Sequence, residues 1–344
     1  MRGKSVQMLV VGLLSVAVAS PLRGDTIQGS WTSPSLDRWM YPFNATPGTR
    51  PTISTFGSDP TSPQFDSRDG QFVLAFNTAP VVEGGLGVEN YTITNAVLTV
   101  EFANDRIVAY DPTPDPWQCF LAPNDPRFVA DADAGQPVEL FGCGFRNGFS
   151  ATNFLENSPY STPPNPLASG VRNAFALSFD NAGAAIDVSN NPRIGFDPLP
   201  FGIGQIVGLE AGELIPLRAR MSFSVAVNQP QIQGYLREAL NRGRLFLVLS
   251  SLTFVQQQGG NFPAFYAKEN PLVQSGQAQP ASLLLTVQTG PTCVAADINC
   301  DGAVNGTDLT LLLSFWGTSG GGDINGDGFV NGSDLAALLG GWTN

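Results

Sequence analysis

The chain has 344 residues, a formal net charge of −12 and no histidine. The absence of histidine excludes Ser-His-Asp triads, Cys-His dyads and histidine-bound metal centres. The acidic balance argues against nucleic acids and anionic membranes as partners.

Residues 1–19 have the organisation of an export signal. Arg2 and Lys4 give a positively charged start, residues 8–19 are apolar, and Ala17-Val18-Ala19 offers a small-residue cleavage site. The apolar run is too short for a transmembrane segment, and we expect no such segment later in the chain. The signal indicates a secreted protein, located outside the cell or at the cell surface.

Residues 25–288 are expected to form an antiparallel β-sandwich. The chain contains 38 glycines and 27 prolines, and short β-branched or aromatic runs lie between turn signals. The clearest strands are predicted at 71–76, 91–102, 174–179, 218–227, 245–249 and 282–287. One helix is predicted at 232–241, where apolar residues share a side and Gly243 follows.

Two proline-rich segments interrupt this pattern, at 110–133 and 159–166. Proline lacks the backbone donor that a central strand needs, so these segments are predicted to be long loop insertions. Loops on a rigid scaffold are frequent binding sites.

Four cysteines form two pairs that are close in sequence, Cys119 with Cys143 and Cys293 with Cys300. An even number in an oxidising compartment favours two disulfides. The alternative, a four-cysteine zinc site, lacks C-x-x-C spacing. A Cys119–Cys143 bridge would pin the first insertion.

Several segments near the two ends of this region occur in a recognisable order. They are Leu36-Asp-Arg-Trp-Met-Tyr41, Phe72-Val-Leu-Ala-Phe76, Ile93-Thr-Asn-Ala-Val-Leu-Thr-Val100, Asn241-Arg-Gly243, Leu245-Phe-Leu-Val-Leu249, Phe265-Tyr-Ala-Lys-Glu269 and Pro280-Ala-Ser-Leu-Leu-Leu-Thr-Val287. This order resembles the DNRLRE-type jelly-roll domain of secreted bacterial proteins. The resemblance implies a jelly-roll-like sandwich, similar in shape to carbohydrate-binding modules and without established chemistry of its own. It does not extend over residues 111–216.

Acidic and aromatic residues define two kinds of candidate site in the sandwich. A glycosidase needs two carboxylates, and the available acids are Asp37, Asp66, Asp69, Glu101, Asp105, Asp111, Asp115, Glu210 and Glu213. Separated acids in an acidic chain are usually surface charges, so we expect no catalysis. For stacking on sugar rings, the aromatic candidates are Trp31, Trp39, Tyr41, Trp117 and Phe120. Trp117 is the preferred one, and the alternative is that it anchors the loop in a core.

Residues 289–296 are predicted to be a linker, and residues 297–344 contain a duplicated calcium-loop pattern. Segments 297–308 and 323–334 read DINCDGAVNGTD and DINGDGFVNGSD, with oxygen side chains at positions 1, 3, 5, 9 and 12 and glycine at position 6. This is the ligand spacing of EF-hand loops, so two Ca²⁺ ions are expected. The predicted ligands of the first ion are Asp297, Asn299, Asp301, the Ala303 carbonyl, Asn305 and Asp308. Those of the second are Asp323, Asn325, Asp327, the Phe329 carbonyl, Asn331 and Asp334.

A short helix is predicted after each loop. Leu309, Leu312, Leu313 and Trp316 of the first copy recur as Leu335, Leu338, Leu339 and Trp342 of the second, at helical spacing. The two stripes are expected to bury each other, and Val304 and Val330 to pair where the loops meet. So small a core indicates that calcium binding is coupled to folding, and a Cys293–Cys300 bridge would brace the first loop.

This pair of loop–helix units, each without an entering helix, resembles the dockerin repeat pair of secreted bacterial proteins. The resemblance implies that loop positions 10 and 11, with basic residues later in each helix, contact a cohesin module. Thr307 and Ser333 occupy position 11 and are the expected partner contacts. This sequence departs from that pattern, because residues 293–344 contain no lysine or arginine. The expected partners are a cohesin-like protein or, instead, another surface protein or this same chain.

We therefore expect a secreted, noncatalytic protein. Its calcium-stabilised module would serve in surface anchoring or assembly, and its sandwich would bind an extracellular polysaccharide or a protein. The alternatives are a polysaccharide hydrolase that uses carboxylates within 111–216 and a structural coat protein.

Overall fold

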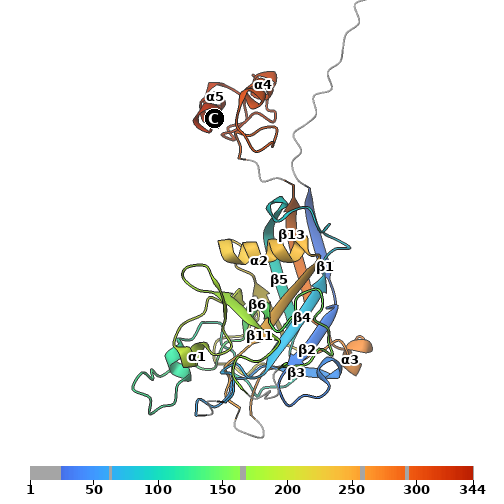
Figure 1. Cartoon of the computed structure of the whole chain (residues 1–344), viewed down its shortest axis with the longest axis vertical. Coiled ribbons are helices and arrows are strands. Elements are labelled where there is room, and N and C mark those ends of the chain that lie inside the picture. The colour runs from blue at the N-terminus through green and yellow to red at the C-terminus, as the bar shows by residue number, and fades with distance from the viewer. Residues whose placement is uncertain (1–24, 62–63, 163–167, 256–259, 291–293, 344) are drawn as a thin grey trace, which may run out of the picture. The chain divides into compact units, whose positions relative to one another are not determined.

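The computed structural model describes residues 25–61, 64–162, 168–255, 260–290 and 294–343. The chain divides into two compact units, Asp25–Gly290 and a C-terminal unit that follows it (Figure 1). The predicted export signal lies outside the described residues. Among the helices that are described, none has the length and apolar character to cross a membrane.

The first unit is mainly β, as predicted, and its sheets are antiparallel. The first sheet has the order β1-β13-β5-β10, formed by Thr26–Trp31, Ser282–Thr289, Tyr91–Glu101 and Arg220–Ser224. The second has the order β2-β4-β11-β6-β7-β8, formed by Leu36–Met40, Gln71–Asn77, Arg244–Ser250, Glu139–Phe145, Ala174–Phe179 and Ala185–Asp187, and β9 (Gly202–Ile203) pairs with β6. Strands β3 (Thr52–Ser54) and β12 (Ala264–Tyr266) form a separate pair. All six predicted strands and the predicted helix are present, with ends shifted by a few residues.

Helix α2 (Pro230–Asn241) is the longest helix of this unit, and it packs on β5 and β11. The other helices are short: η1 (Pro47–Thr49), η2 (Val88–Asn90), η3 (Trp117–Phe120), α1 (Asn191–Ile194) and α3 (Pro271–Gln274). The start of β1 and the end of β13 lie together at one end of the unit. Helices α1 and α3 lie at the opposite end (Figure 1). We call that opposite end the loop end.

Two apolar cores cover the two faces of the second sheet. Phe72, Leu74 and Phe76 of β4 belong to the main core, which includes residues of the first sheet and of α2. Val73 and Ala75, which alternate with them, belong to a second core. Burial on both faces explains why β4 and β11 are continuous apolar runs, whereas β5 of the first sheet alternates.

Strand β6 was missed by the sequence analysis because Gly142 and Gly144 weaken its strand pattern. In the structure the Tyr235 ring lies over Gly142, and a Cβ there would come within 3.1 Å of it. The Tyr235 hydroxyl accepts a hydrogen bond from the Cys143 N–H (2.9 Å) and donates one to the Phe246 carbonyl (2.7 Å). The glycine therefore lets a side chain of α2 link β6 to β11, just beyond the last paired residues of the two strands.

The predicted Cys119–Cys143 disulfide is wrong, because both residues are free thiols. Cys143 is buried in the second core, and Cys119 lies in η3 near Asp115 and Asp131. Closeness in sequence did not bring the two side chains together, because a strand and a separate loop carry them. Cys300 is disulfide-bonded, and its predicted partner Cys293 lies outside the described residues.

The C-terminal unit contains α4 (Gly306–Ser314) and α5 (Gly332–Gly340). Its core consists of Ala296, Ile298, Val304, Leu312, Val330 and Leu338. Ala296, predicted to end the linker, is thus part of this core. Val304 and Val330 share the core, but their backbones do not pair with each other. The Val304 carbonyl accepts from Thr343, and the Val330 carbonyl accepts from Gly317.

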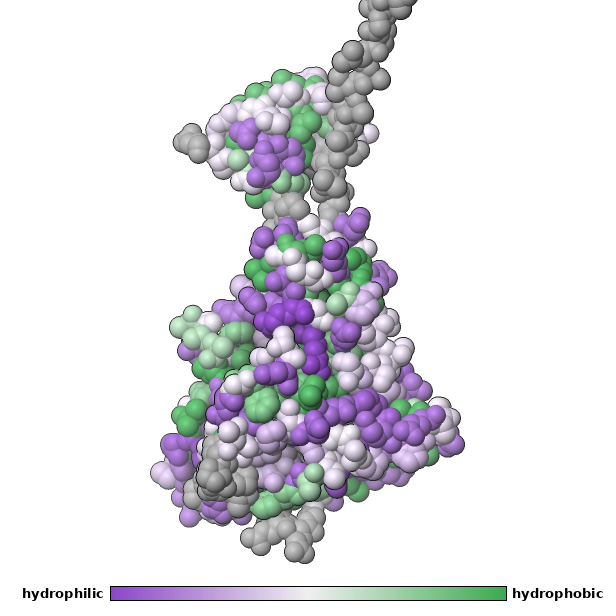
Figure 2. Space-filling view, turned by 45° about the vertical axis from the view of Figure 1, so that its right-hand side comes forward, coloured by the Kyte–Doolittle hydropathy of each residue, from purple (hydrophilic) through white to green (hydrophobic). Residues whose placement is uncertain are grey.

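The predicted apolar stripes are partly wrong. Leu312 and Leu338 are buried and Leu309 and Leu335 are half-buried, but the other members are exposed: Leu313, Trp316, Leu339 and Trp342. The first helix ends at Ser314, and Phe315 rather than Trp316 packs against the core. Apolar residues therefore remain on the surface of this unit beside hydrophilic ones (Figure 2).

The hydroxyl of Tyr235 provides a test of the link between α2 and the second sheet. Tyr235→Phe should lower the free energy of unfolding by about 1–3 kcal/mol, because two buried backbone groups lose a partner. Urea denaturation of the full chain measures the change. Tyr41→Phe, on a half-exposed ring, is the control and should change stability by less than about 0.5 kcal/mol. Equal stability of wild type and Tyr235→Phe would contradict the proposed link.

Candidate functional site

The two predicted calcium loops have the same hydrogen-bond pattern. Asp297, at position 1, accepts from the N–H groups of Asp301 (3.2 Å) and Gly302 (2.9 Å). Asp323, at the equivalent position, accepts from Asp327 (3.1 Å) and Gly328 (2.8 Å). The duplicated sequence thus gives a duplicated geometry, in which position 1 is bonded to positions 5 and 6.

Position 12 closes each loop. Asp308 accepts from the N–H groups of Asn299 (3.1 Å) and Asn305 (2.9 Å), which are positions 3 and 9. Asp334 accepts from the equivalent residues at 3.1 and 2.8 Å. The same aspartates complete the capping boxes of α4 and α5. The backbone N–H groups that donate to Asp334 lower its pKa, and that of Asn331 has the largest effect.

Positions 4 and 6 of each loop have left-handed backbones. Gly302 and Gly328 have φ of 90° and 95°, as the sharp turn of a calcium loop requires. At position 4, Gly326 has φ of 75° and Cys300 has φ of 60°. At position 4, the disulfide-bonded cysteine of the first loop and the glycine of the second loop therefore share the same left-handed backbone conformation.

The predicted ligands fit a hard cation by chemistry and by charge. They offer carboxylate, amide and carbonyl oxygens, which Ca²⁺ prefers. Asp308 and Asp334 are 0% exposed, and this segment of the chain has no lysine or arginine to neutralise them. A buried carboxylate without a basic partner is costly, so a bound cation would relieve the cost. Some described side chains form groups of three carboxylates whose oxygens all lie within 4.8 Å of one another. The three aspartates of each calcium loop do not form such a group.

Two such groups lie in the sandwich. In the first, Asp37, Glu156 and Glu269 surround Lys268, whose Nζ lies 2.9 Å from Asp37 and 2.8 Å from Glu269 and also contacts Glu156. Burial raises the pKa of Asp37, although Lys268 opposes the rise. The ammonium group occupies the centre of this group, so we interpret it as a structural ion-pair network.

The second group contains Asp111, Asp115 and Asp133, all from the first proline-rich insertion. Burial, followed by the carboxylates of Asp111, Asp131 and Asp133, raises the pKa of Asp115 to about 8. The sequence analysis considered Asp111 and Asp115 as separate acids and did not foresee this group.

Other buried acids of the sandwich are paired with arginine. Asp66 lies 2.7 Å from Arg172, and Glu139 lies 2.6 Å from Arg68. Although burial alone would raise the pKa of Asp66, Arg172 and the Gly170 N–H lower it. These contacts fix loops and strands to one another, so the acids involved are not available as a catalytic pair.

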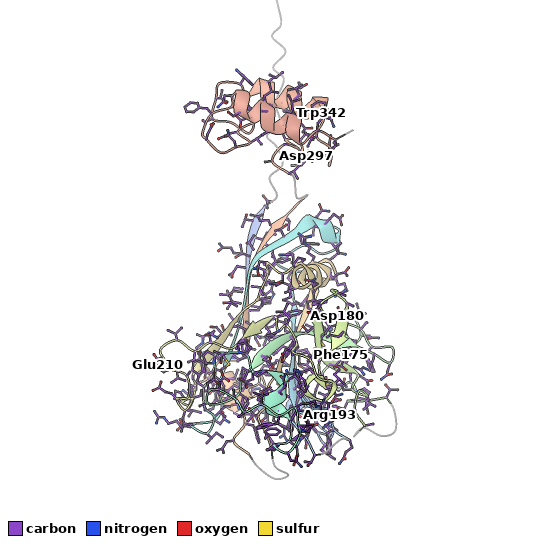
Figure 3. All side chains as sticks on the ribbon, turned by 90° about the vertical axis from the view of Figure 1, so that its left-hand side faces the viewer. Phe175, Asp180, Arg193, Glu210, Asp297 and Trp342 are labelled. Atoms are coloured by element: carbon purple, nitrogen blue, oxygen red, sulfur yellow. The ribbon has the colours of Figure 1, made fainter. Side chains whose placement is uncertain are left out.

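Trp117, the predicted stacking residue, is half-buried in η3. Its ring lies against Gly195, and the guanidinium of Arg127 lies 5.4 Å from its centre. A cavity of about 140 Å³ near this insertion is lined by residues that include Phe120, Arg127, Arg193 and Phe254. In Figure 3, Arg193 is labelled at the loop end of the sandwich. The Trp117 ring thus packs against Gly195 and Arg127, and its role in sugar stacking stays a prediction.

A different set of rings includes an exposed member. Trp39, Tyr41, Phe43 and Phe65 form a continuous row, which we call the aromatic strip, with successive ring centres 4.5, 5.4 and 6.2 Å apart. Phe43 is 60% exposed, and the buried Phe56 supports Tyr41 from 5.4 Å. The sequence analysis named Trp39 and Tyr41 but not the row, which Phe43 of the same segment and Phe65 of a separate one complete.

An open groove of about 620 Å³ lies between residues 45–49 and 155–157. Leu36 and Arg244 also line it. Glu156 is the acid that lines this groove, and it is held by Lys268. The groove therefore has room for a ligand, but its carboxylate is part of an ion-pair network.

Comparison with known proteins gave no match to a family model, to a curated protein or to a solved structure. The dockerin and DNRLRE resemblances therefore rest on the sequence motifs alone.

The buried acid Asp69 should make stability depend on pH. Burial raises its pKa to about 6 from 3.8, although Arg172 opposes the rise. The folded chain then binds this proton more tightly than the unfolded chain, so stability falls as pH rises from about 4 to 6. Above that window the charged Asp69 costs on the order of 2–3 kcal/mol. Asp69→Asn should therefore stabilise the protein at pH 8, and by less at pH 5.

Thermal unfolding at both pH values measures this effect. Asp66→Asn is the matched control, because the pKa of Asp66 is lowered by its partners. The charged Asp66 stabilises the fold above about pH 4, and this contribution is lost at lower pH. The Asp66→Asn variant should therefore be destabilised at pH 8. A destabilised Asp69→Asn at pH 8 would show that its charge supports the fold.

Proposed function

We propose that this is a secreted, noncatalytic protein in which a dockerin-like C-terminal module is stabilised by two Ca²⁺ ions and attaches the protein to a surface or assembly. The jelly-roll-like sandwich binds an extracellular polymer, most simply a polysaccharide. The observation that carries the proposal is the duplicated hydrogen-bond pattern at loop positions 1, 3, 5, 6, 9 and 12 around buried carboxylates without a basic partner.

Calcium, when bound, supplies positive charge at the centre of each loop. The side chains at positions 1, 3, 5 and 12 would hold it, with the Ala303 or Phe329 carbonyl. The small core of this unit supports the same conclusion, because six buried residues provide little apolar burial for two helices. Binding then contributes directly to the folding of the unit.

Exposed residues of the C-terminal unit support a role in attachment. Thr307 and Ser333 are exposed near the start of each helix. Leu313 and Leu339 are exposed further along, where dockerins are expected to carry basic residues. An apolar partner surface, on a cohesin-like or other surface protein, fits this composition better than an acidic one.

The aromatic strip supports polymer binding by the sandwich. Its rings hold one another in edge and stacked contacts, and Arg50 lies 5.0 Å over the Trp39 ring. Such a row offers flat apolar faces beside a cation, which suits a hydroxyl-rich sugar chain. Within residues 111–216, Glu139 and Glu156 are held in ion pairs, which favours this binding function over the hydrolase alternative.

The calcium sites can be tested on the full chain. Asp301→Ala combined with Asp327→Ala should remove two ions per chain in isothermal titration, because each variant loses the central carboxylate of one loop. Chelation should also expose residues 297–343 to chymotrypsin, and mass spectrometry would identify the cuts. Asp105→Asn, on the sandwich, is the control and should leave both results unchanged. Identical ion counts for wild type and the double variant would exclude the two sites.

The aromatic strip can be tested with a panel of immobilised polysaccharides. Tyr41→Ala combined with Phe43→Ala should weaken binding about tenfold or more, which corresponds to about 1.4 kcal/mol for two lost rings. Phe254→Ala, at another exposed ring, should bind as the wild type does. Loss of binding in Trp117→Ala alone would favour the residue preferred from sequence, and a panel without any bound polymer would favour the coat-protein alternative.

A further inference from the structure

The acidic group in the first insertion combines three carboxylates that come from the two ends of one loop. Asp111 and Asp115 lie at the beginning of residues 111–133, and Asp133 lies at the end. One oxygen of each lies within 4.8 Å of the others. Between them the chain contains no regular element except η3.

Asp111 is held rigidly at this position. It is 3% exposed, and its Oδ1 accepts hydrogen bonds from the N–H and the hydroxyl of Thr113, both at 2.8 Å. The preceding Tyr110 is also buried, and its N–H donates to the Glu213 carbonyl. Gly135 (φ +110°) returns the chain beside it, where a Cβ would lie 3.1 Å from Asp111 Cβ.

Two oxygens of the group lack partners. Asp111 Oδ2 and Asp115 Oδ2 are buried and have no hydrogen-bond donor. The Thr113 hydroxyl lies 2.8 Å from Asp111 Oδ1 and 3.0 Å from Asp133 Oδ2, so a single hydroxyl proton faces two carboxylates. Burying such oxygens is unfavourable unless a cation or a donor joins them.

We propose that Asp111, Asp115 and Asp133 bind a third calcium ion, which ties the two ends of the insertion together. Oxygen ligands at about 2.4 Å from Ca²⁺ lie up to about 4.8 Å apart, whereas the shorter bonds to Mg²⁺ allow less. Asp133 is exposed and Asp115 is half-buried, so water can complete the coordination. The ion would thus close the loop that the predicted Cys119–Cys143 disulfide does not close.

Isothermal titration of the full chain with CaCl₂ tests this site. Wild type should bind three ions and the Asp301→Ala/Asp327→Ala variant one. Adding Asp115→Asn to that variant should remove the last ion. Adding Glu83→Gln, at an exposed acid outside the insertion, should leave it bound. Asp133→Asn is a second variant at an exposed side chain, and it should weaken the site while leaving the fold intact.

Trypsin provides an independent readout, because Arg127 lies inside the loop with more than half of its side chain exposed. In the Asp301→Ala/Asp327→Ala background, calcium at ten times its dissociation constant should slow cleavage after Arg127 about tenfold. Asp115→Asn should abolish this protection. The proposal would be overturned if the Asp301→Ala/Asp327→Ala variant bound no ion. It would also be overturned if the ion persisted after Asp115→Asn and Asp133→Asn were added. Neither result depends on the C-terminal sites.

Discussion

Buried carboxylates in this protein fall into two groups according to whether a basic side chain lies beside them. Asp66 has Arg172, Glu139 has Arg68 and Asp37 has Lys268. Each of these pairs joins segments that are distant in sequence, and each compensates the cost of removing a charge from water. Asp308, Asp334 and Asp111 are equally buried, but their nearest described partners are N–H groups and a hydroxyl. An external cation is the simplest way to balance the second group.

The second sheet explains why the ion pairs are needed. Both of its faces are buried, so the loops that cover its outer face must pack closely on it. Arg68 reaches under this layer and contacts the Val188 carbonyl and Asn191 as well as Glu139. Arg38 does the same with the carbonyls of Glu156 and Ser158. Where the backbone of the covering loops is irregular, arginine side chains thus donate the hydrogen bonds that a neighbouring strand would otherwise donate.

What the sequence predicted depended on how local the information was. The hydrogen-bonded loops at 297–308 and 323–334 and the strand of residues 71–76 follow from local patterns, because spacing within twelve residues determines them. The assignment of their oxygens as calcium ligands stays a prediction. The exposure of Trp316 was not, since it depends on where α4 ends relative to a core that includes the other copy. The Cys119–Cys143 bridge failed for a similar reason, because their separation is set by tertiary packing. The group at Asp111 and Asp133 joins residues that no periodic pattern relates.

The two C-terminal loops are similar in sequence but not equivalent in flexibility. Position 4 is a disulfide-bonded Cys300 in the first loop and Gly326 in the second. Glycine samples left-handed and right-handed backbones freely when the loop is open, whereas a cross-linked cysteine samples fewer conformations. Ordering the second loop therefore costs more conformational entropy for the same ligand set. Val304 and Val330 each bond to the segment after the other copy's helix, so the conformation of each loop is coupled to the other copy.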